Sequence, residues 1–369
     1  MMRVFLEPLD VWLFRDGRPF DALSDHRAQS IFPPLPTVAQ GVIRSAHLAY
    51  RGVPISDYIY GHAPHVEAEI GPPGKHPPFT VRGPFIARMD EARDAVIRYL
   101  PRPADASLSD GDWMAPGPLS DGPFANNLPD SVRLLWTSFR PQKDEEAANW
   151  MSEATLGTYL AKGQVARGKV YQDADLFVRE SRFGIGLDST LRRPHEGALY
   201  EIEFVRAKEG VGLEIEVQGL DMNCWPQSGL LKIGGEGRAA MVQKLQDRPS
   251  MGVGQMPDPE DQGRVRFKLY FATPAYFDDG WRPSDWGRFF NGSAPQLAAA
   301  AVERPLVLGG IDLAKAEKGG GQPHKPAKRY VPAGSVYFFE GDDTTTLKSE
   351  HVTDFGATIG FGQIFVGRW

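Results

Sequence analysis

Basic side chains stand beside glycine-rich turns at three separate places in this chain. These places are Arg182 with Gly184 and Gly186, Arg238 after Gly237, and Lys328 with Arg329 ahead of Gly360, Phe361, Gly362 and Gln363. Backbone amides in glycine-rich loops, together with Arg and Lys side chains, are the groups that bind a ribose-phosphate chain. The pattern therefore predicts RNA contacts at these loops. The alternative interpretation is that the glycines only close sheets.

The C-terminal run 355–369 has glycine at positions 356, 360, 362 and 367, among residues that favour strands. A dinucleotide-binding loop would open a helix, because the helix N-terminus holds the pyrophosphate. Here the glycines are followed by Ile364 to Val366, which is typical of a strand. No cofactor is therefore expected, and the run is either a loop close to RNA or a loop that closes a sheet.

Aromatic side chains near these loops could stack on unpaired RNA bases. The candidates are Phe183, Tyr330 and Phe361, and each of them could equally be a core residue. The best helical pattern of the chain begins with Thr37 as a possible N-cap and stops at Gly52. One stripe of this helix carries Gln40, Arg44, His47 and Arg51. That stripe is either a solvated face or a second contact to RNA through Arg44.

Other chemistries find less support in the sequence. There is no Gly-x-Ser-x-Gly turn, no His-Glu-x-x-His motif and no P-loop. The pair His62 and His65 lies among Gly and Pro, which indicates a solvated loop, so no metal site is expected. Cys224 is the only cysteine and cannot form an internal disulfide. Cleavage of RNA by general acid-base catalysis through His26 or His47 stays open as an alternative.

Length and composition limit the class of protein. A chain of 369 residues predicts two domains, and no apolar run approaches the roughly 20 residues of a membrane-spanning helix. The N-terminal sequence has no signal-peptide pattern, so a cytoplasmic location is expected. The formal charge is −6, so any polyanion must bind to local patches. One such patch is predicted between Lys162 and Arg193, which includes Lys169 and has seven basic against four acidic residues.

The elements that must position these residues are mostly strands. Residues 3–14 read as a first strand interrupted at Pro8, 198–220 as a β-hairpin, and 71–124 as short strands separated by long loops. Residues 286–303 read as partly helical. Composition becomes linker-like at 251–263, which predicts an N-terminal module at 1–250 and a C-terminal module at 264–369. The order of elements in the second module suits a ferredoxin-like β-α-β-β unit.

Several motifs together resemble one known family, the third subunit of the Cmr (type III-B) CRISPR effector complex. The motifs are Glu180-Ser-Arg-Phe-Gly-Ile-Gly-Leu-Asp188, Gly197-Ala-Leu-Tyr200, Gly234-Gly-Glu-Gly-Arg238, Val331-Pro-Ala-Gly-Ser-Val-Tyr337 and Gly360-Phe-Gly362. The opening, with Arg15-Asp-Gly-Arg-Pro-Phe20 and Pro33-Pro34 ahead of Thr37, Gly41 and Arg44, is also similar to that family. The resemblance runs from Asp10 to the C-terminus with a gap at about 85–165.

The resemblance implies an α+β repeat-associated mysterious protein (RAMP). Such a protein has two ferredoxin-like (RRM-like) modules with antiparallel sheets, long loop insertions and a C-terminal glycine-rich loop. It also implies a subunit that is not a nuclease. That subunit holds the repeat-derived 5′ handle of the guide RNA and joins the large Palm-domain subunit to the RAMP backbone subunits, within a hetero-oligomeric ribonucleoprotein. By position, Arg182, Arg238, Lys328 and Arg329 would contact handle phosphates, Gly360 to Gln363 would pass close to the RNA, and Arg44 would face it.

Overall fold

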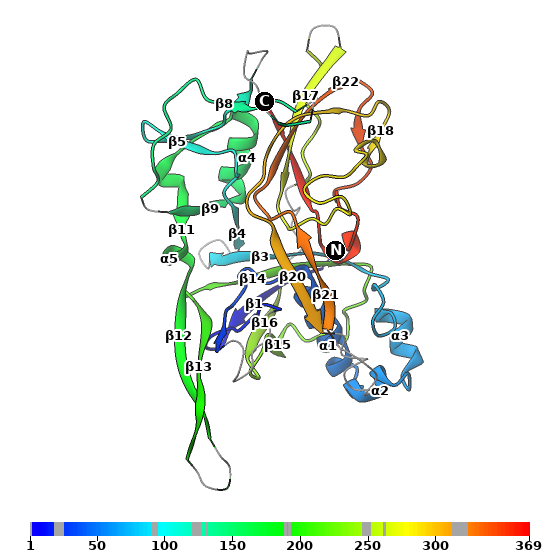
Figure 1. Ribbon diagram of the computed structural model, residues 1–369. Coiled ribbons are helices and arrows are strands. Elements are labelled where there is room, and N and C mark those ends of the chain that lie inside the picture. Colours follow the sequence, from blue (N-terminus) through cyan, green and yellow to red (C-terminus); the bar gives the residue numbers. More distant parts are fainter. Residues whose placement is uncertain are drawn as a thin grey trace. The chain divides into compact units, whose positions relative to one another are not determined.

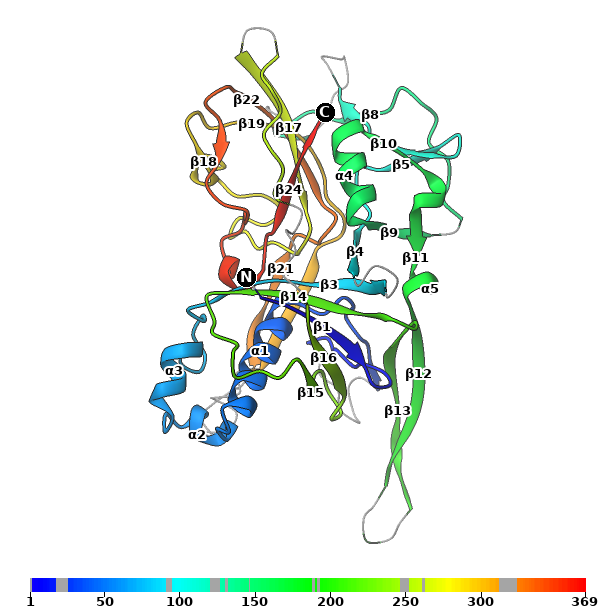
Figure 2. The same ribbon diagram turned by 180° about the vertical axis from the view of Figure 1, so that it is seen from behind.

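The computed structural model groups the chain into two compact units, each assembled from three segments (Figures 1 and 2). It describes residues 2–17, 26–90, 95–119, 127–129, 132–145, 147–187, 190, 193–245, 252–260, 263–311 and 324–369. Unit 1 comprises Met1–Val96, Ala174–Asp247 and Val307–Lys328, and unit 2 comprises Ile97–Asp173, Arg248–Leu306 and Arg329–Trp369. The module boundaries at 250 and 264 stay predictions.

Unit 1 is a sheet with helices and a separate hairpin. Its main elements are β1 (Met2–Pro8), β2 (Arg27–Ala28), α1 (Pro36–Tyr50), α2 (Ile55–Ile59), α3 (Pro64–Ile70), β3 (Thr80–Asp90), β12 (Phe177–Leu187), β13 (Pro194–Ala207), β14 (Val211–Gln218), β15 (Ser228–Lys232), β16 (Ala239–Leu245), β20 (Leu306–Ile311) and β21 (His324–Tyr330). The strands of the sheet in this unit run in the order β3-β14-β1-β16-β15. Strand β1 is central because Val4, Phe5 and Leu6 are all buried, and it pairs antiparallel with β14 and β16.

Helix α1 confirms the strongest helical pattern of the sequence, with a different start. Its N-cap position is Leu35, which makes no side-chain cap bond, and Pro36 opens the first turn. Thr37 is therefore inside the helix and not its cap. Proline suits this place, because the first turn leaves its backbone donors unbonded anyway. Gly52, at φ +69°, follows the C-terminal end in the left-handed conformation that glycine tolerates best.

The predicted hairpin over 198–220 is wrong, because its two strands belong to different sheets. Strand β13 pairs antiparallel with the preceding strand β12, with Arg182 opposite Ile202. Strand β14 instead pairs with β1 and β3. The alternating pattern found the strands correctly. The choice of partner depended on burial, since β14 is buried along almost its whole length and needs strands on both sides.

Unit 2 contains a second sheet, and α4 (Glu153–Lys162) is the longest helix described in this unit. Its main elements are β4 (Ala95–Pro101), β5 (Ser107–Ser109), β6 (Asp112–Met114), β7 (Gly117–Pro118), β8 (Leu135–Trp136), β9 (Ala148–Ser152), α4 (Glu153–Lys162), β10 (Gln164–Ala166), η2 (Arg167–Lys169), β11 (Val170–Gln172), β17 (Arg264–Phe271), η4 (Gly287–Phe289), β18 (Phe290–Asn291), β19 (Gln296–Ala301), β22 (Val336–Asp342), β23 (Thr346–Leu347), η5 (Ala357–Ile359) and β24 (Ile364–Arg368). The short helix α5 (Asp173–Leu176) leads from this unit into β12.

The antiparallel sheet β19-β22-β17-β24 carries the core of unit 2. Phe267, Leu269 and Phe339 are fully buried in a cluster that includes Trp286 and Ile364. The prediction of helix within 286–303 is wrong, since this segment forms the single 3₁₀ turn η4 and the strands β18 and β19. Among the described residues from 263 onward there is no α-helix, and the ferredoxin-like form of the two modules is not confirmed.

Candidate nucleic-acid interface

The hairpin β12–β13 extends away from the sheet of unit 1 in both views (Figures 1 and 2). Glu180 lies opposite Phe204, and Arg182 lies opposite Ile202. Directly opposite residues of an antiparallel pair share a face, and so do residues two apart on one strand. Register therefore places Glu180, Arg182, Phe204 and Arg206 on one face near the base of the hairpin.

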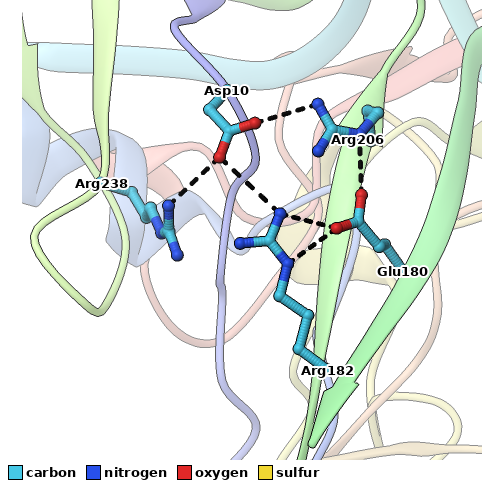
Figure 3. A network of polar contacts seen from close by, with 5 residues as sticks. All are labelled: Asp10, Glu180, Arg182, Arg206 and Arg238. Carbon is cyan, nitrogen blue, oxygen red and sulfur yellow. Dashed lines mark hydrogen bonds and ion pairs between the residues drawn. The ribbon is translucent and has the colours of Figure 1, made fainter.

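Three arginines and two carboxylates meet on this face (Figure 3). Glu180 accepts from Arg182 at 2.6 Å between Nη2 and Oε1, and from Arg206 at 2.7 Å between Nε and Oε2. Asp10, from the loop after β1, lies 3.0 Å from Nη1 of Arg206, 3.3 Å from Nη1 of Arg238 and 3.8 Å from Nη2 of Arg182. We call these five residues the arginine network. Two of its cations were predicted from the sequence, and the structure brings them together through Asp10.

The aromatic ring of Phe204 lies close to the guanidinium groups of two of these arginines. The guanidinium carbons of Arg182 and Arg238 lie 4.9 and 4.7 Å from the centre of its ring. Phe204 itself is buried against Val11 and Leu13. Cations at this distance from an aromatic ring are attracted to its face. The ring therefore helps to hold both guanidinium groups in place at the surface.

The charges of the network leave one positive charge in excess, since it contains three arginines and two carboxylates. Hydrogen bonds from Arg206 and Arg182 lower the pKa of Glu180, and the same contacts with Glu180 and Asp10 raise the pKa of Arg206. Both effects keep the groups ionised at neutral pH. The arginine side chains are between a quarter and two fifths exposed. The guanidinium groups of this arrangement can bind an anion.

Arg44 does not face solvent. It is 8% exposed and donates from Nε to the carbonyl of Ile70 at 3.0 Å and from Nη2 to the carbonyl of Lys75 at 2.8 Å. Burial lowers its pKa. Within unit 1 this side chain holds the loop after α3 onto α1, so an RNA contact through Arg44 would require these bonds to be exchanged.

The other predicted cations are exposed and are not members of the network. Lys169 ends the 3₁₀ turn η2 of unit 2, whereas the arginine network belongs to unit 1. Lys328 and Arg329 lie on β21 with exposed side chains. Their predicted contacts with phosphates stay predictions.

The predicted glycine loop Gly360–Gln363 is buried inside unit 2. The carbonyl of Gly360 accepts from Oγ1 of Thr273 at 2.7 Å, and Gly362 bonds through its amide to Pro274 and through its carbonyl to Val352. Phe361 is 1% exposed and packs 5.2 Å from the ring of Tyr330. Because these groups already have partners, the loop closes the sheet before β24, and Phe361 has no free surface on which a base could stack.

Gly184 and Gly186 have a local explanation in the hairpin. A Cβ atom on Gly184 would collide with the ring of Tyr200, which lies across the strand from it. A Cβ atom on Gly186 would lie 3.0 Å from that of Ala198. These glycines let cross-strand neighbours pack closely, and their predicted contact with RNA stays a prediction.

The three aromatic candidates for base stacking differ sharply in exposure. Phe183 is 73% exposed, whereas Tyr330 is 7% and Phe361 1% exposed. The face of the hairpin that carries Phe183 also exposes Ile185, Leu187 and Leu199. Phe183 is therefore the one member of this trio with a ring free in the described structure.

Sequence reasoning missed Asp10, Glu180 and Arg206 as members of the network. Glu180 was visible, two residues before Arg182 on a strand and so on the same face. Arg206 follows Phe204 by two residues in a strand, but only the register of β12 against β13 brings it to Glu180. Asp10 lies 196 residues from Arg206 along the chain, and no sequence signal joins them.

The histidines considered for acid-base catalysis are placed differently. His47 is fully buried, and both of its ring nitrogens are engaged: Nε2 lies 2.6 Å from Oε2 of Glu69, and Nδ1 accepts from Nε1 of Trp225 at 3.2 Å. It therefore has no ring nitrogen free for a substrate. His26 is exposed.

Two features are absent from the described part of the chain. No three His, Cys, Asp or Glu side chains gather there as a metal site would require. None of the helices found there is both long and apolar enough to span a membrane.

Comparisons with known proteins address the family. A family model described as "CRISPR-associated protein (Cas_Cmr3)" matches residues 4–369, and no curated protein matches. Among solved structures, a chain of "Cryo-EM structure of the Type III-B Cmr-beta bound to cognate target RNA" is similar at 16% identity and TM-score 0.49, covering 91% of this chain and 86% of that one. The same complex with AMPPnP gives 15% identity at the same TM-score and coverage.

A chain of "Crystal structure of Csm3-Csm4 subcomplex in the type III-A CRISPR-Cas interference complex" is similar at 11% identity and TM-score 0.40. That match covers 100% of this chain and 99% of that one. The match of the family model spans nearly the whole sequence, so it includes every motif on which the resemblance was based. The predicted resemblance is confirmed, and the chain belongs to the Cas_Cmr3 family of CRISPR-associated proteins.

Proposed function

We propose that this chain is a non-catalytic RNA-binding and scaffold subunit of a type III-B effector complex. It holds the repeat-derived 5′ handle of the guide RNA and bridges the large Palm-domain subunit to the RAMP backbone. Its membership of the Cas_Cmr3 family supports the place in such a complex. The observation that carries the RNA-binding role is the arginine network, in which Arg182 and Arg238 lie around one carboxylate with Arg206.

The network suits phosphate better than it suits a purely structural role. Ion pairs that are this exposed stabilise a protein by only about 0–1 kcal/mol, so three arginines here add little to the fold. A guanidinium group can donate two parallel hydrogen bonds to a phosphate, and the excess positive charge favours an anion. A phosphate can therefore replace Asp10 or Glu180 as the partner of one arginine at small cost.

The opposite face of the hairpin offers a second element, because Phe183 directly follows Arg182 on β12 and adjacent strand residues point to opposite faces. Phe183 is exposed on the strand that also carries Arg182, and RNA-binding proteins use such rings to stack unpaired bases. Cations on one face of the hairpin and an exposed ring on the other can serve one single-stranded RNA that passes around the edge strand β12, since such an RNA offers phosphates and bases in succession.

The test is RNA retention by the assembled complex with Arg182→Ala and Arg238→Ala combined. We expect affinity for a guide RNA with an intact 5′ handle to fall by about a hundredfold or more, since two charge-assisted hydrogen bonds contribute roughly 1.5–3 kcal/mol each. The slope of log K against log salt should fall by about 1.4 for two lost phosphate contacts. Arg51→Ala is the matched control, because Arg51 is similarly exposed in the same unit and pairs with Glu69. If both variants retain RNA equally, the chain is a structural adaptor.

The second candidate function is a metal-independent endoribonuclease that processes guide RNA. The engaged nitrogens of His47 argue against it, and the exposed His26 is the remaining candidate base. Incubation of the purified protein with repeat RNA in a chelator separates the two functions. Site-specific cleavage that is lost in His26→Ala would overturn the non-catalytic role.

A further inference from the structure

Strand β15 forms an edge of the sheet in unit 1 (Figures 1 and 2). It pairs with β16 on one side, with Leu230 opposite Met241. Its other side faces no further strand among the residues that the structure describes. An unpaired strand edge presents a row of backbone donors and acceptors to which another strand can add.

The alternation of hydrogen bonds between β15 and β16 shows which backbone groups of β15 are unbonded. The amide of Lys244 donates to Gln227 at 2.9 Å, and the amide of Ile233 donates to Arg238 at 2.9 Å. In antiparallel pairs, bonded residues alternate with residues whose N–H and C=O point away. Gly229 and Leu231 therefore bond to β16, whereas Ser228, Leu230 and Lys232 direct their N–H and C=O groups outward. No described residue bonds to those outward groups.

The sheet of unit 2 is different, because the chain covers both of its edges. The amide of Arg133 donates to Ala298 of edge strand β19 at 2.7 Å. On the opposite edge, the amides of Ile364 and Val366 in β24 donate to Glu350 and Val253. Natural sheets cover or charge their edges because free edges pair with other chains. The open edge of β15 therefore contrasts with both described edges of the sheet in unit 2.

The side chains beside this edge are apolar at its centre. Leu230 is 60% exposed and Met241 is 41% exposed, and the two lie directly opposite each other on the solvent face. Lys232, at the end of the strand, is exposed on the same face. The chemistry of this surface fits a segment with an apolar side chain beside Leu230 and an acidic one near Lys232.

We propose that β15 binds an extended segment of a partner protein subunit, which adds to the sheet as its next strand. Each free residue of β15 offers one donor and one acceptor. A polypeptide strand supplies both complements at the same spacing, whereas the phosphates of RNA only accept hydrogen bonds. Pairing of β15 with a second copy of itself would set Lys232 opposite Ser228 and leave its charge without an acidic partner. The proposal goes beyond RNA binding and uses different strand residues from the arginine network.

The test is hydrogen exchange resolved to single amides, measured on the chain alone and in the effector complex assembled with its partner subunits and guide RNA. We expect exchange at Ser228, Leu230 and Lys232 to slow at least about tenfold on assembly, as in a newly paired strand. The amides of Gly229 and Leu231 are internal controls, since β16 already protects them. Unchanged exchange at the three outward amides would overturn the proposal.

A variant supplies an independent measurement. Leu230→Lys places a charge at the centre of the edge while leaving the ladder to β16 intact. In competition with the wild-type chain, we expect its incorporation into the complex to fall at least about fivefold, which corresponds to roughly 1 kcal/mol. Ile55→Lys is the control, because Ile55 is 57% exposed on the short helix α2. Equal incorporation of Leu230→Lys and Ile55→Lys would contradict the proposal.

Two further measurements identify the molecule that pairs with β15. If the isolated chain dimerises and its outward amides slow with protein concentration, the occupant is a second copy and the proposed partner is wrong. If guide RNA alone slows them, the occupant is RNA and the proposal is again wrong. The RNA-retention test of Arg182 and Arg238 can fail without changing any of these results, so the two proposals are separable.

Discussion

The arginine network and the C-terminal loop 356–362 are both associated with glycine-rich turns but serve different purposes. In the network, charged side chains from four separate stretches of chain meet at a partly exposed surface. In the loop, Gly356, Gly360 and Gly362 adopt positive φ angles, and Phe361 is buried among aromatic rings. A glycine-rich sequence therefore does not by itself indicate a ligand, because close packing of backbone requires the same residues.

The difference lies in what remains available for a partner. The loop has already used its amides and carbonyls in bonds to Val352, Thr273 and Pro274. The network holds its arginines with exposed carboxylates, which an incoming phosphate can replace. We therefore expect changes in the loop to alter stability and changes in the network to alter RNA binding.

The largest contrast should come from the same Phe→Ala substitution made in the loop and on the exposed face of the hairpin β12–β13. Phe361→Ala should lower the free energy of unfolding by about 3–5 kcal/mol, as for other buried phenylalanines. Phe183→Ala, at the 73% exposed ring, should change it by less than about 0.5 kcal/mol but weaken RNA binding by roughly 1–3 kcal/mol. Urea unfolding and RNA titration measure the two effects. A large loss of stability in Phe183→Ala would contradict this division of roles.

Backbone conformation gives a second, somewhat smaller effect in the loop. Gly362 has φ +66°, and a Cβ atom there would lie 2.5 Å from the carbonyl oxygen of Val352 and 2.6 Å from Cβ of Thr353. Gly362→Ala should therefore destabilise unit 2 by about 3 kcal/mol, combining backbone strain with overpacking. Gly168→Ala is the control, since no atom lies within 4 Å of its added Cβ. Similar unfolding curves for the two variants would refute the assigned role of Gly362.

Arg206 tests the network with a residue that the sequence did not point to. Arg206→Ala should weaken RNA binding by about tenfold or more, because one charge-assisted hydrogen bond contributes roughly 1.5–3 kcal/mol. The salt slope should fall by about 0.7. Fluorescence titration at several salt concentrations measures both quantities. An unchanged slope would mean that Arg206 only positions Glu180 and Asp10.

Asp10 should have the opposite effect on the same measurement. Its carboxylate is shared by three arginines, so it competes with an incoming phosphate. Asp10→Asn should strengthen RNA binding about threefold, which is of the order of 0.6 kcal/mol for one exposed charge. The control Asp57→Asn, on α2, should leave affinity unchanged. Weaker binding in Asp10→Asn would show that Asp10 orients the arginines and does not compete.

The smallest effect concerns pH. Arg206 and Arg182 lower the pKa of Glu180 in the folded protein relative to its ordinary value. The stabilisation is therefore complete above the unfolded pKa and is lost as pH falls through the lower folded value. Glu180→Gln should remove this part of the acid sensitivity, as seen by comparing urea midpoints at neutral and acid pH. Parallel pH profiles for the variant and the wild type would contradict the pairing.

Much of the local structure could be predicted from sequence, because local rules depend on few neighbours. The apolar residues near the N-terminus located the first strand, although it ends at Pro8 and does not continue to residue 14 as predicted, and periodicity located α1. The partner of β13 and the strand β19 were missed. A strand pattern in the sequence does not show which strand it pairs with. The run Gln296–Ala301 is rich in alanine, which favours a helix in isolation, but in the structure this run is a strand paired with β22.

The sequence by itself determined the family, through ordered motifs, and supplied Arg182 and Arg238 beside glycine turns. Tertiary structure decided which of the cations meet. Arg238 lies 228 residues from Asp10 along the chain, and only sheet register and the buried ring of Phe204 bring them together. It also decided that Arg44 and Phe361 are buried and that β15 keeps a free edge. The burial of side chains and the pairing of strands depend on segments that are distant in the sequence. The spacing of residues along the sequence therefore cannot predict them.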